Sequence, residues 1–275
     1  MTQSRLVYQT NIWQEEPETN NPFAAKTSYC HGYDVYHQIV PHATWVESLY
    51  LLVKGERPTP QQAQLLEKMA IILSYTSMRD ASVRAAMNSG VSGATHAATL
   101  MAALAVGAGQ YGGSHEVNLA VQLWQRCGFD PELWQQHLLA YQNPKSVHHV
   151  TDIWLDIEHP IGFDPHAPQC QTTVLQALAL LAPLSAGQAL TWLAQQRQHL
   201  EQTVNASLSM TGVMAAAFFD LGFTEHQAEM LFLILRLPSA AVFALEQQQQ
   251  GWRKFPFFGE QIQLNNDCGQ QGAVS

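Results

Sequence analysis

Residues 45–73 read WVESLYLLVKGERPTPQQAQLLEKMAIIL, and this stretch decides the class of fold. Apolar residues recur at helical spacing before Gly55, which is a typical residue for a helix C-cap. Thr59, Pro60 and Gln62 then follow as an N-cap, a proline at the first helical position and a capping-box partner. The stretch therefore predicts two consecutive amphipathic helices joined by a short turn.

Helical patterns continue along the rest of the chain, whereas β-branched residues never alternate over a useful length. The first forty residues are polar and irregular, apart from a strand-like scrap at 5–8. We expect further helices at 92–106, 118–125, 131–142, 172–181, 186–198, 210–221, from a capping box at 224–227 through 235, and at 238–249. The sequence predicts an all-α protein of roughly ten helices without an internal repeat.

The composition restricts the classes of partner. The 275 residues (30.6 kDa) are 47% hydrophobic, so a sizeable core is possible, and only 13% are charged. The net charge of −9 argues against nucleic acid and anionic membranes as partners, since both need clustered positive charge. The longest small-and-apolar run, 97–109, is too short to span a bilayer, and residues 1–16 lack the blocks of a signal peptide. We expect a cytoplasmic protein.

The cysteines and the histidine-rich loop offer little support for a metal site. Cys30, Cys127, Cys170 and Cys268 are far apart and form no CxxC pair, which argues against a disulfide framework or a cysteine-type zinc site. The loop 148–159 is rich in His, Asp and Glu but lacks the spacing of known metal motifs. We expect no bound metal and no covalently bound cofactor.

Glycines in the segment 107–112 match the dinucleotide pattern GxGxxG. That fingerprint requires a preceding strand, and the residues before it have the composition of a helix. The simpler interpretation is a helix end turned by glycines, with Gly112 and Gly113 permitting a close backbone approach.

Two polar residues stand out from their surroundings. His159 precedes the turn sequence 162–165, and turns of this type can hold a side chain above a cavity. Arg236 is the only charged residue between 230 and 245, so it must pair with an acid or bind an anion. Structural pairing is the default interpretation for Arg236, and ligand binding is the alternative.

Five segments occur in a suggestive order. They are GYD at 32–34 with WVESLYLLVKGE at 45–56, GQYGG at 109–113 with Glu116, EHP at 158–160 with DP at 164–165, NAS at 205–207, and the apolar helix 234–246. Taken together they resemble the citrate synthase superfamily, and specifically its short branch of citryl-CoA lyases, over residues 30–254.

The resemblance implies an all-α, citrate-synthase-like fold in a homodimer. It implies a large helical dimerisation domain, residues 1–116 plus 205–275, and a smaller inserted helical domain, residues 117–204, that closes over the substrates. The low charge fraction and the apolar segment 92–106 suit burial at a subunit interface.

The resemblance also implies a lyase or acyltransferase that makes or cleaves a carbon–carbon bond. Its substrates would be an acetyl-CoA-like CoA thioester and an oxaloacetate-like keto acid or the related tricarboxylic acid. The nucleotide of CoA would be held by loop groups near the second family histidine, for which Lys145 and 146–152 are the candidates.

The implied catalytic residues depart from the family pattern. His159 matches the second catalytic histidine, and Tyr111 stands in place of the first. Ser207 occupies the position of the catalytic aspartate, and a serine hydroxyl is no general base without an activator. Ser209 could fill that position if the register slips, and His115 is a possible substitute base.

The remaining implied residues bind substrate. Arg236 matches a carboxylate-binding arginine, His166 replaces another, and Gly112, Gly113 and Asn205 complete the set. Besides the enzyme, two alternatives stay open. One is a catalytically degenerate member that binds a CoA thioester or a carboxylate without turnover, and the other is a helical structural or dinucleotide-binding protein with accidental matches.

Overall fold

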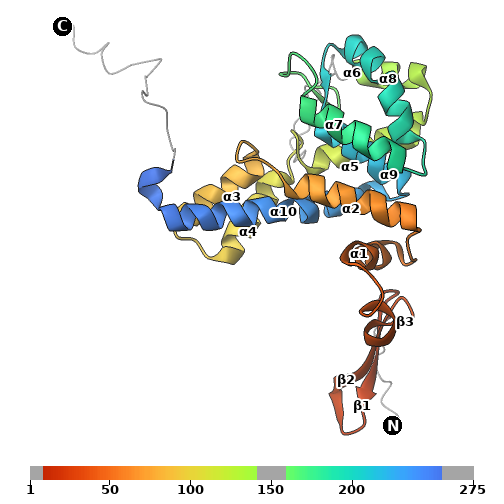
Figure 1. Cartoon of the computed structure of the whole chain (residues 1–275), viewed down its shortest axis with the longest axis vertical. Helices are drawn as coiled ribbons and strands as arrows, with labels where there is room; N and C mark the ends of the chain where they lie inside the picture. The colour runs from red at the N-terminus through yellow and green to blue at the C-terminus, as the bar shows by residue number, and fades with distance from the viewer. Residues whose placement is uncertain (1–8, 141–158, 256–275) are drawn as a thin grey trace, which may run out of the picture.

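The computed structural model describes residues 9–140 and 159–255, and Figure 1 shows that helices dominate it. The helices are α1 (Trp45–Lys54), α2 (Pro60–Ser74), α3 (Ala81–Val91), α4 (His96–Gly107), α5 (Ser114–Cys127), α6 (Pro131–Ala140), α7 (Thr172–Leu181), α8 (Ala189–Val204), α9 (Met210–Asp220) and α10 (Glu225–Gln250). The strands are β1 (Trp13–Glu18), β2 (Asn21–Cys30), β3 (Tyr33–Asp34), β4 (Phe163–Asp164) and β5 (Ser207–Leu208). The all-α prediction is confirmed for the body of the protein.

Capping residues mark the starts of the predicted helices. Thr59 accepts the Gln62 amide while the Gln62 side chain accepts the Thr59 amide, so a capping box opens α2. Thr224 and Gln227 form the same box at the start of α10. Gly55 ends α1 with φ +78°, a left-handed conformation that favours glycine. These local signals lie in the sequence itself.

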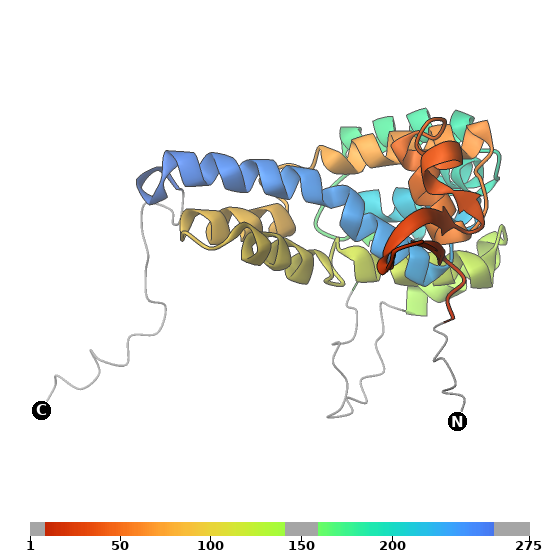
Figure 2. The same ribbon diagram turned by 90° about the horizontal axis from the view of Figure 1, so that it is seen from below.

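The last two predicted helices form one helix, α10, which contains Pro238. Proline removes one backbone hydrogen bond and disfavours helix at the residue before it, so local preference predicts a break there. The Ser74 hydroxyl donates to the Leu235 carbonyl, and the Ser239 hydroxyl donates to the Ser74 carbonyl. Contacts with α2 support this region of α10, which bends in Figure 2 without ending.

An N-terminal hairpin corrects the prediction that the first forty residues are irregular. β1 pairs antiparallel with β2, from Trp13 opposite Cys30 to Glu18 opposite Asn21. All of β1 is exposed, and Figure 1 shows the hairpin projecting away from the helices. Because neither face of β1 packs on a core, its sequence carries no alternating pattern that would reveal it. The predicted strand at 5–8 lies outside the described residues.

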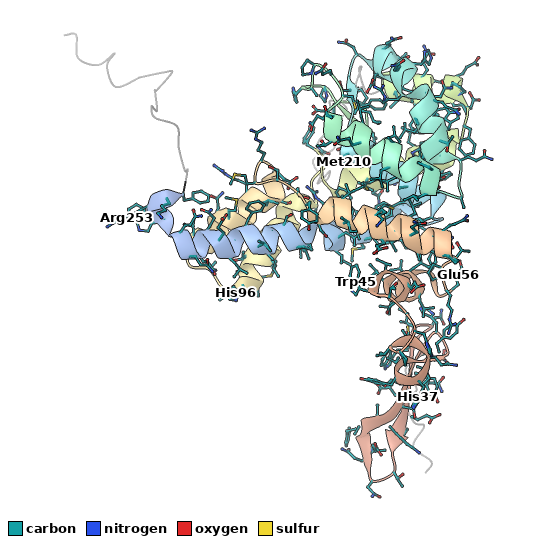
Figure 3. All side chains as sticks on the ribbon, in the orientation of Figure 1. His37, Trp45, Glu56, His96, Met210 and Arg253 are labelled. Carbon is teal, nitrogen blue, oxygen red and sulfur yellow. The ribbon has the colours of Figure 1, made fainter. Side chains whose placement is uncertain are left out.

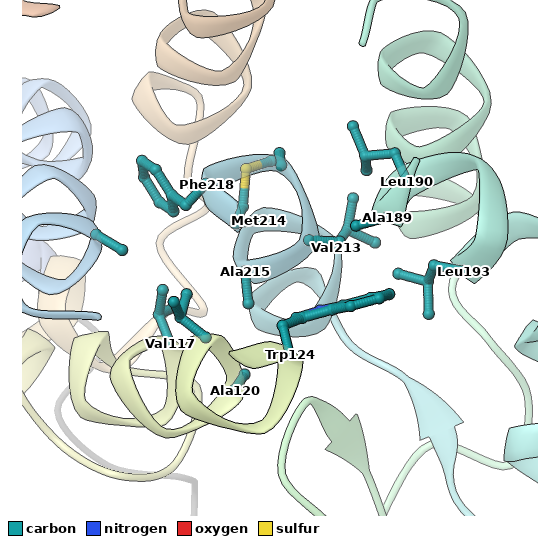
Figure 4. Close-up of a cluster of buried hydrophobic side chains, with 14 of the residues drawn as sticks. Val117, Ala120, Trp124, Ala189, Leu190, Leu193, Val213, Met214, Ala215 and Phe218 are labelled. Atoms are coloured by element: carbon teal, nitrogen blue, oxygen red, sulfur yellow. The ribbon is translucent and has the colours of Figure 1, made fainter. Parts of the chain in front are cut away.

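The main core surrounds α9, in which the whole run 211–218 is buried. Figure 4 shows Val213, Met214 and Ala215 of α9 beside Trp124 of α5. The Trp124 ring contacts the rings of Trp134, Trp192 and Phe219, which come from α6, α8 and α9. Aromatic clusters of this kind bury large areas, so this cluster fixes α6 and α8 against the helices that frame the site.

A second, smaller core joins α3, α4 and α10. The sequence prediction missed α3 and started α4 too early, since Thr95 caps α4 and His96 is its first residue. At Gly90 a side chain would meet the Ala244 carbonyl oxygen at 2.8 Å, so α3 and α10 cross in close contact. The outer face of these helices remains apolar and exposed, and Figure 3 shows this arm extending away from Met210.

Among the described helices, only α10 is long and apolar enough to cross a membrane by length and composition. It packs against α2, α3, α4 and α5, and 44% of its most apolar window is buried inside the protein. Core helices meet the same criterion, and these contacts make α10 the central support of the fold.

Candidate active site

A cavity of about 650 Å³ lies between the turn before α5, the segment 159–166 and the start of α9. Its lining combines two carboxylates, two imidazoles and two hydroxyls in one recess. The lining residues are Tyr111, Gly112, Glu116, His159, Phe163, Asp164, Pro165, His166 and Ser209.

The glycine turn closes over the start of α5. Gly112 has φ +67°, a left-handed conformation that strains other residues. At Gly113 an added Cβ would lie 2.1 Å from the Gly109 carbonyl oxygen, so the backbone leaves no room for a side chain. The turn directly follows helix α4 and not a strand, so the structural requirement of the dinucleotide fingerprint is not met.

Glu116 connects the two segments that line the cavity. The residue is 1% exposed. Oε2 accepts the Gly112 amide at 2.7 Å, and Oε1 accepts the Gly162 amide at 2.9 Å. Oε1 also lies 3.4 Å from Nε2 of His159. A buried carboxylate is costly unless it is paired, and these donors compensate its burial.

His159 lies beneath Tyr111 at the wall of the cavity. Only 5% of His159 is exposed, whereas Tyr111 is 59% exposed. The two rings pack with centroids 5.0 Å apart and an interplanar angle of 30°. The two residues that resemble the family's catalytic histidine positions are therefore in contact.

A pair of glycines brings the His159 segment against α9. Gly162 has φ +81°, and its carbonyl accepts the Ser209 amide at 3.0 Å. A Cβ on Gly212 would lie 2.5 Å from the Gly162 carbonyl oxygen, so both positions need glycine. β4 and β5 continue this contact as a two-stranded antiparallel pair. The backbones at Gly162 and Gly212 are too close to leave room for a side chain. This close contact holds the segment that carries His159 against the start of α9.

The structure separates the two candidate serines. Ser207 is buried in β5 and donates to the Ala167 carbonyl at 3.0 Å, and it lies outside the lining of the 650 Å³ cavity. Ser209 lines that cavity as the N-cap of α9 and shares a 2.6 Å hydrogen bond with Thr211. Ser209, and not Ser207, therefore lines the cavity together with His159 and Tyr111.

His115 and Arg236 do not belong to the lining of the 650 Å³ cavity. His115 faces α10, with Nδ1 3.9 Å from Glu229. Arg236 pairs with Asp80 and donates to the Gly112 carbonyl at 3.1 Å. Burial lowers the pKa of Arg236, and the Asp80 carboxylate opposes that shift. Arg236 is therefore paired with an acid inside the protein and also holds a carbonyl of the glycine turn.

The last two candidates lie at the edges of the site. His166 lines the cavity and is exposed. Asn205 ends α8 with φ +50° and lies at a second cavity of about 710 Å³ that also contains Ser207 and Cys170. Burial raises the pKa of Cys170 to about 11, so its thiol is a poor nucleophile near neutral pH.

Sequence reasoning gave no role to Glu116 and Asp164, although both line the cavity. The one sequence feature that pointed to Glu116 is its place in the first turn of a helix that follows two glycines. Two candidate regions, Lys145 with 146–152 and most of the histidine-rich loop, lie outside the described residues. Within 9–140 and 159–255, no three His, Cys, Asp or Glu residues gather as a metal site, and Cys30, Cys127 and Cys170 are free thiols.

Known structures share this fold. Citryl-CoA lyase from Hydrogenobacter thermophilus superposes with a TM-score of 0.68 at 16% identity, over 94% of this chain and 97% of that one. ATP citrate lyase from Methanothrix soehngenii, solved with citrate and coenzyme A, has a TM-score of 0.72 at 14% identity, over 99% of this chain and 44% of that one. Citrate synthase from Thermotoga maritima has a TM-score of 0.59 at 15% identity, over 80% and 58%.

No protein-family profile matches the sequence, and no curated protein sequence matches it. The structural likeness alone therefore defines the class, a helical protein with the citrate synthase fold. Within that class the fold resembles the citryl-CoA lyase branch, as the sequence resemblance implied.

Proposed function

We propose that this protein is an enzyme that makes or cleaves a carbon–carbon bond between an acyl-CoA and a keto acid. The CoA thioester would be its substrate, and citryl-CoA is the natural first candidate for cleavage. The observation that carries the proposal is the buried pair His159 and Glu116 at the wall of a cavity of about 650 Å³. The same fold occurs in citryl-CoA lyase, ATP citrate lyase and citrate synthase.

The chemistry suits these groups. Breaking the carbon–carbon bond beside a thioester requires removal of a hydroxyl proton and stabilisation of the enolate that forms. An imidazole can supply the proton transfer, and the imidazole of His159 is itself shielded from bulk water. Tyr111 and Ser209 offer hydroxyl donors at the same cavity.

The alternative is a catalytically degenerate protein that binds a CoA thioester or a carboxylate without turnover. Ser207, which matches the family aspartate in sequence, donates its hydroxyl to a backbone carbonyl. Arg236 is occupied by Asp80. Among the described residues that line the cavity, only the imidazoles of His159 and His166 can carry positive charge. With few positive charges at the cavity, we expect it to bind a tricarboxylate only weakly, which favours this alternative.

We also infer that two copies of the chain pair through the apolar outer face of α4 and α10. Met101, Val106, Val242 and Leu245 are exposed there, and an apolar patch of this kind marks an interaction surface. The division into 1–116 plus 205–275 and 117–204, and a role for Lys145 and 146–152 in holding CoA, belong to the same proposal.

The test is incubation of the purified protein with citryl-CoA, followed by mass spectrometry of the products. We expect wild type to release acetyl-CoA and oxaloacetate and His159→Ala to lose at least about 100-fold in rate, the lower range for a general acid–base group. His199→Ala is the matched control, because His199 lies exposed on α8 away from the cavity. It should keep wild-type activity.

Two outcomes would contradict the proposed enzymatic function. Unchanged citryl-CoA together with a melting temperature raised by CoA would favour the degenerate protein, since a ligand that binds only the native state stabilises it. Equal activity of wild type and His159→Ala would show that the reaction occurs elsewhere.

A further inference from the structure

Three of the four buried side-chain atoms without a hydrogen-bond partner in the described residues lie close to the glycine turn in sequence or space. They are Gln110 Oε1, Ser114 Oγ and His159 Nδ1. Leaving a buried polar atom unpaired costs about 1–3 kcal/mol, and such atoms in native proteins usually have a functional reason. His159 Nδ1 is the one that belongs to a residue lining the cavity.

The other ring nitrogen of His159 faces a fixed acceptor. Nε2 lies 3.4 Å from Oε1 of Glu116, long for a hydrogen bond but close enough to tighten when a ligand binds. Glu116 cannot turn away, because the amides of Gly112 and Gly162 hold both of its oxygens. An ionised carboxylate only accepts hydrogen bonds, so the neutral imidazole is stabilised with its hydrogen on Nε2.

We propose that Glu116 is a positioning residue that fixes the Nε2–H tautomer of His159 and thereby makes Nδ1 the proton acceptor for the substrate. This inference rests on the proposed function and adds a residue to it. Its geometry resembles the general arrangement in which a carboxylate orients a catalytic imidazole. The ring of Tyr111 covers the imidazole, and its exposure lets a substrate displace it.

The cleavage step balances with this pair alone. Nδ1 takes the proton of the substrate hydroxyl, and that oxygen forms the ketone as the carbon–carbon bond breaks. The electron pair of that bond becomes the enolate of the thioester, and the imidazolium returns the proton to the enolate carbon. No oxidant or further acid is needed, which explains how the site would work without a carboxylate at Ser207.

The first test is independent of turnover. Long-range nitrogen–proton correlation spectra of protein with isotope-labelled histidine report which ring nitrogen is protonated, and His159→Gln assigns the His159 signals. At alkaline pH we expect the Nε2–H tautomer in wild type and in Glu116→Asp. Glu116→Gln should lose this preference, because an amide can donate as well as accept. Glu229→Gln, which alters the acid beside His115, should leave the His159 signals unchanged.

The second test is kinetic. Glu116→Gln should lower kcat for citryl-CoA by about 100-fold or more with little change in KM, and Glu116→Asp should recover part of it. If Glu116→Gln does not fold, the wild-type spectrum remains the test, because the proposed role requires the Nε2–H tautomer there.

An Nδ1–H tautomer in wild type, or the same tautomer in wild type and Glu116→Gln, would overturn the role of Glu116. A tautomer that responds to Glu116→Gln in a protein that leaves citryl-CoA unchanged would instead support the positioning role and overturn the proposed function.

Discussion

At the scale of single residues, the site depends on positions where no side chain fits. Gly113 has no room because the Gly109 carbonyl lies where its Cβ would be, and Gly212 is closed in the same way by Gly162. Gly112 differs, because its surroundings are open and only its φ of +67° favours glycine. The two neighbouring positions of this turn thus favour glycine for different reasons, lack of space at Gly113 and a left-handed backbone at Gly112.

Gly113→Ala and Gly112→Ala should therefore differ in effect. Gly112→Ala should cost about 1–2 kcal/mol of unfolding free energy, the strain of a left-handed residue. Gly113→Ala must displace the turn and Glu116 with it, so we expect a larger loss of stability and loss of activity. Urea unfolding measures the stability of the two variants, and the citryl-CoA assay measures their activity. Equal effects of the two variants would show that the turn has more freedom than its backbone contacts imply.

At the scale of elements, α3 and α10 are joined beneath the glycine turn by one acid. Asp80 accepts the amides of Ser82 and Val83 as the N-cap of α3, and its other oxygen pairs with Arg236 of α10. Arg236 in turn holds the Gly112 carbonyl. The cap of one helix therefore also supports the turn that closes the site.

Asp80→Ala should destabilise the protein by about 3–5 kcal/mol, because it leaves the buried guanidinium of Arg236 unpaired. Asp130→Ala is the matched control. Asp130 accepts the amides of Glu132 and Leu133 at the start of α6, and no ion pair of Asp130 occurs in the described residues. Its loss should cost only about 0.5–2 kcal/mol, as for a cap. Urea unfolding at one protein concentration compares the unfolding free energies of the two variants. Equal losses would show that the ion pair between Asp80 and Arg236 does not contribute to stability.

At the scale of the whole molecule, the arm formed by α3, α4 and α10 exposes an apolar surface of a kind that partners usually bury. Figure 3 shows His96 and Arg253 on this arm, far from the helices around Met210. The arm has its own small core, yet Met101 and Val242 are more than 60% exposed. A second copy of the chain would bury these side chains, and pairing through equivalent faces is the commonest arrangement of homo-oligomers.

Light scattering at micromolar concentration should give twice the chain mass of 30.6 kDa for wild type. Met101→Glu and Val242→Glu should each shift the mass towards one chain, because a charge would be buried without a partner. Leu180→Glu is the control, since Leu180 is similarly exposed on α7. A wild-type mass of one chain would exclude the dimer under these conditions.

Part of the candidate site could be predicted from the sequence. Tyr111 and His159 follow from short motifs in a recognisable order, and the structure places them in contact. The role of Glu116 could not be predicted, because it depends on amides at Gly112 and Gly162 that are fifty residues apart in the chain. The choice between Ser207 and Ser209 depends on which hydroxyl faces the cavity.

The helical class and most helix starts follow from local signals, because capping and apolar periodicity act within a few residues, as at Thr59 and Thr224. The packing of distant segments, in contrast, makes α10 continue through Pro238, pairs Arg236 with Asp80 and brings Glu116 to His159. Each of these rests on contacts between distant segments, whose energies outweigh local preference and leave no periodic trace in the chain.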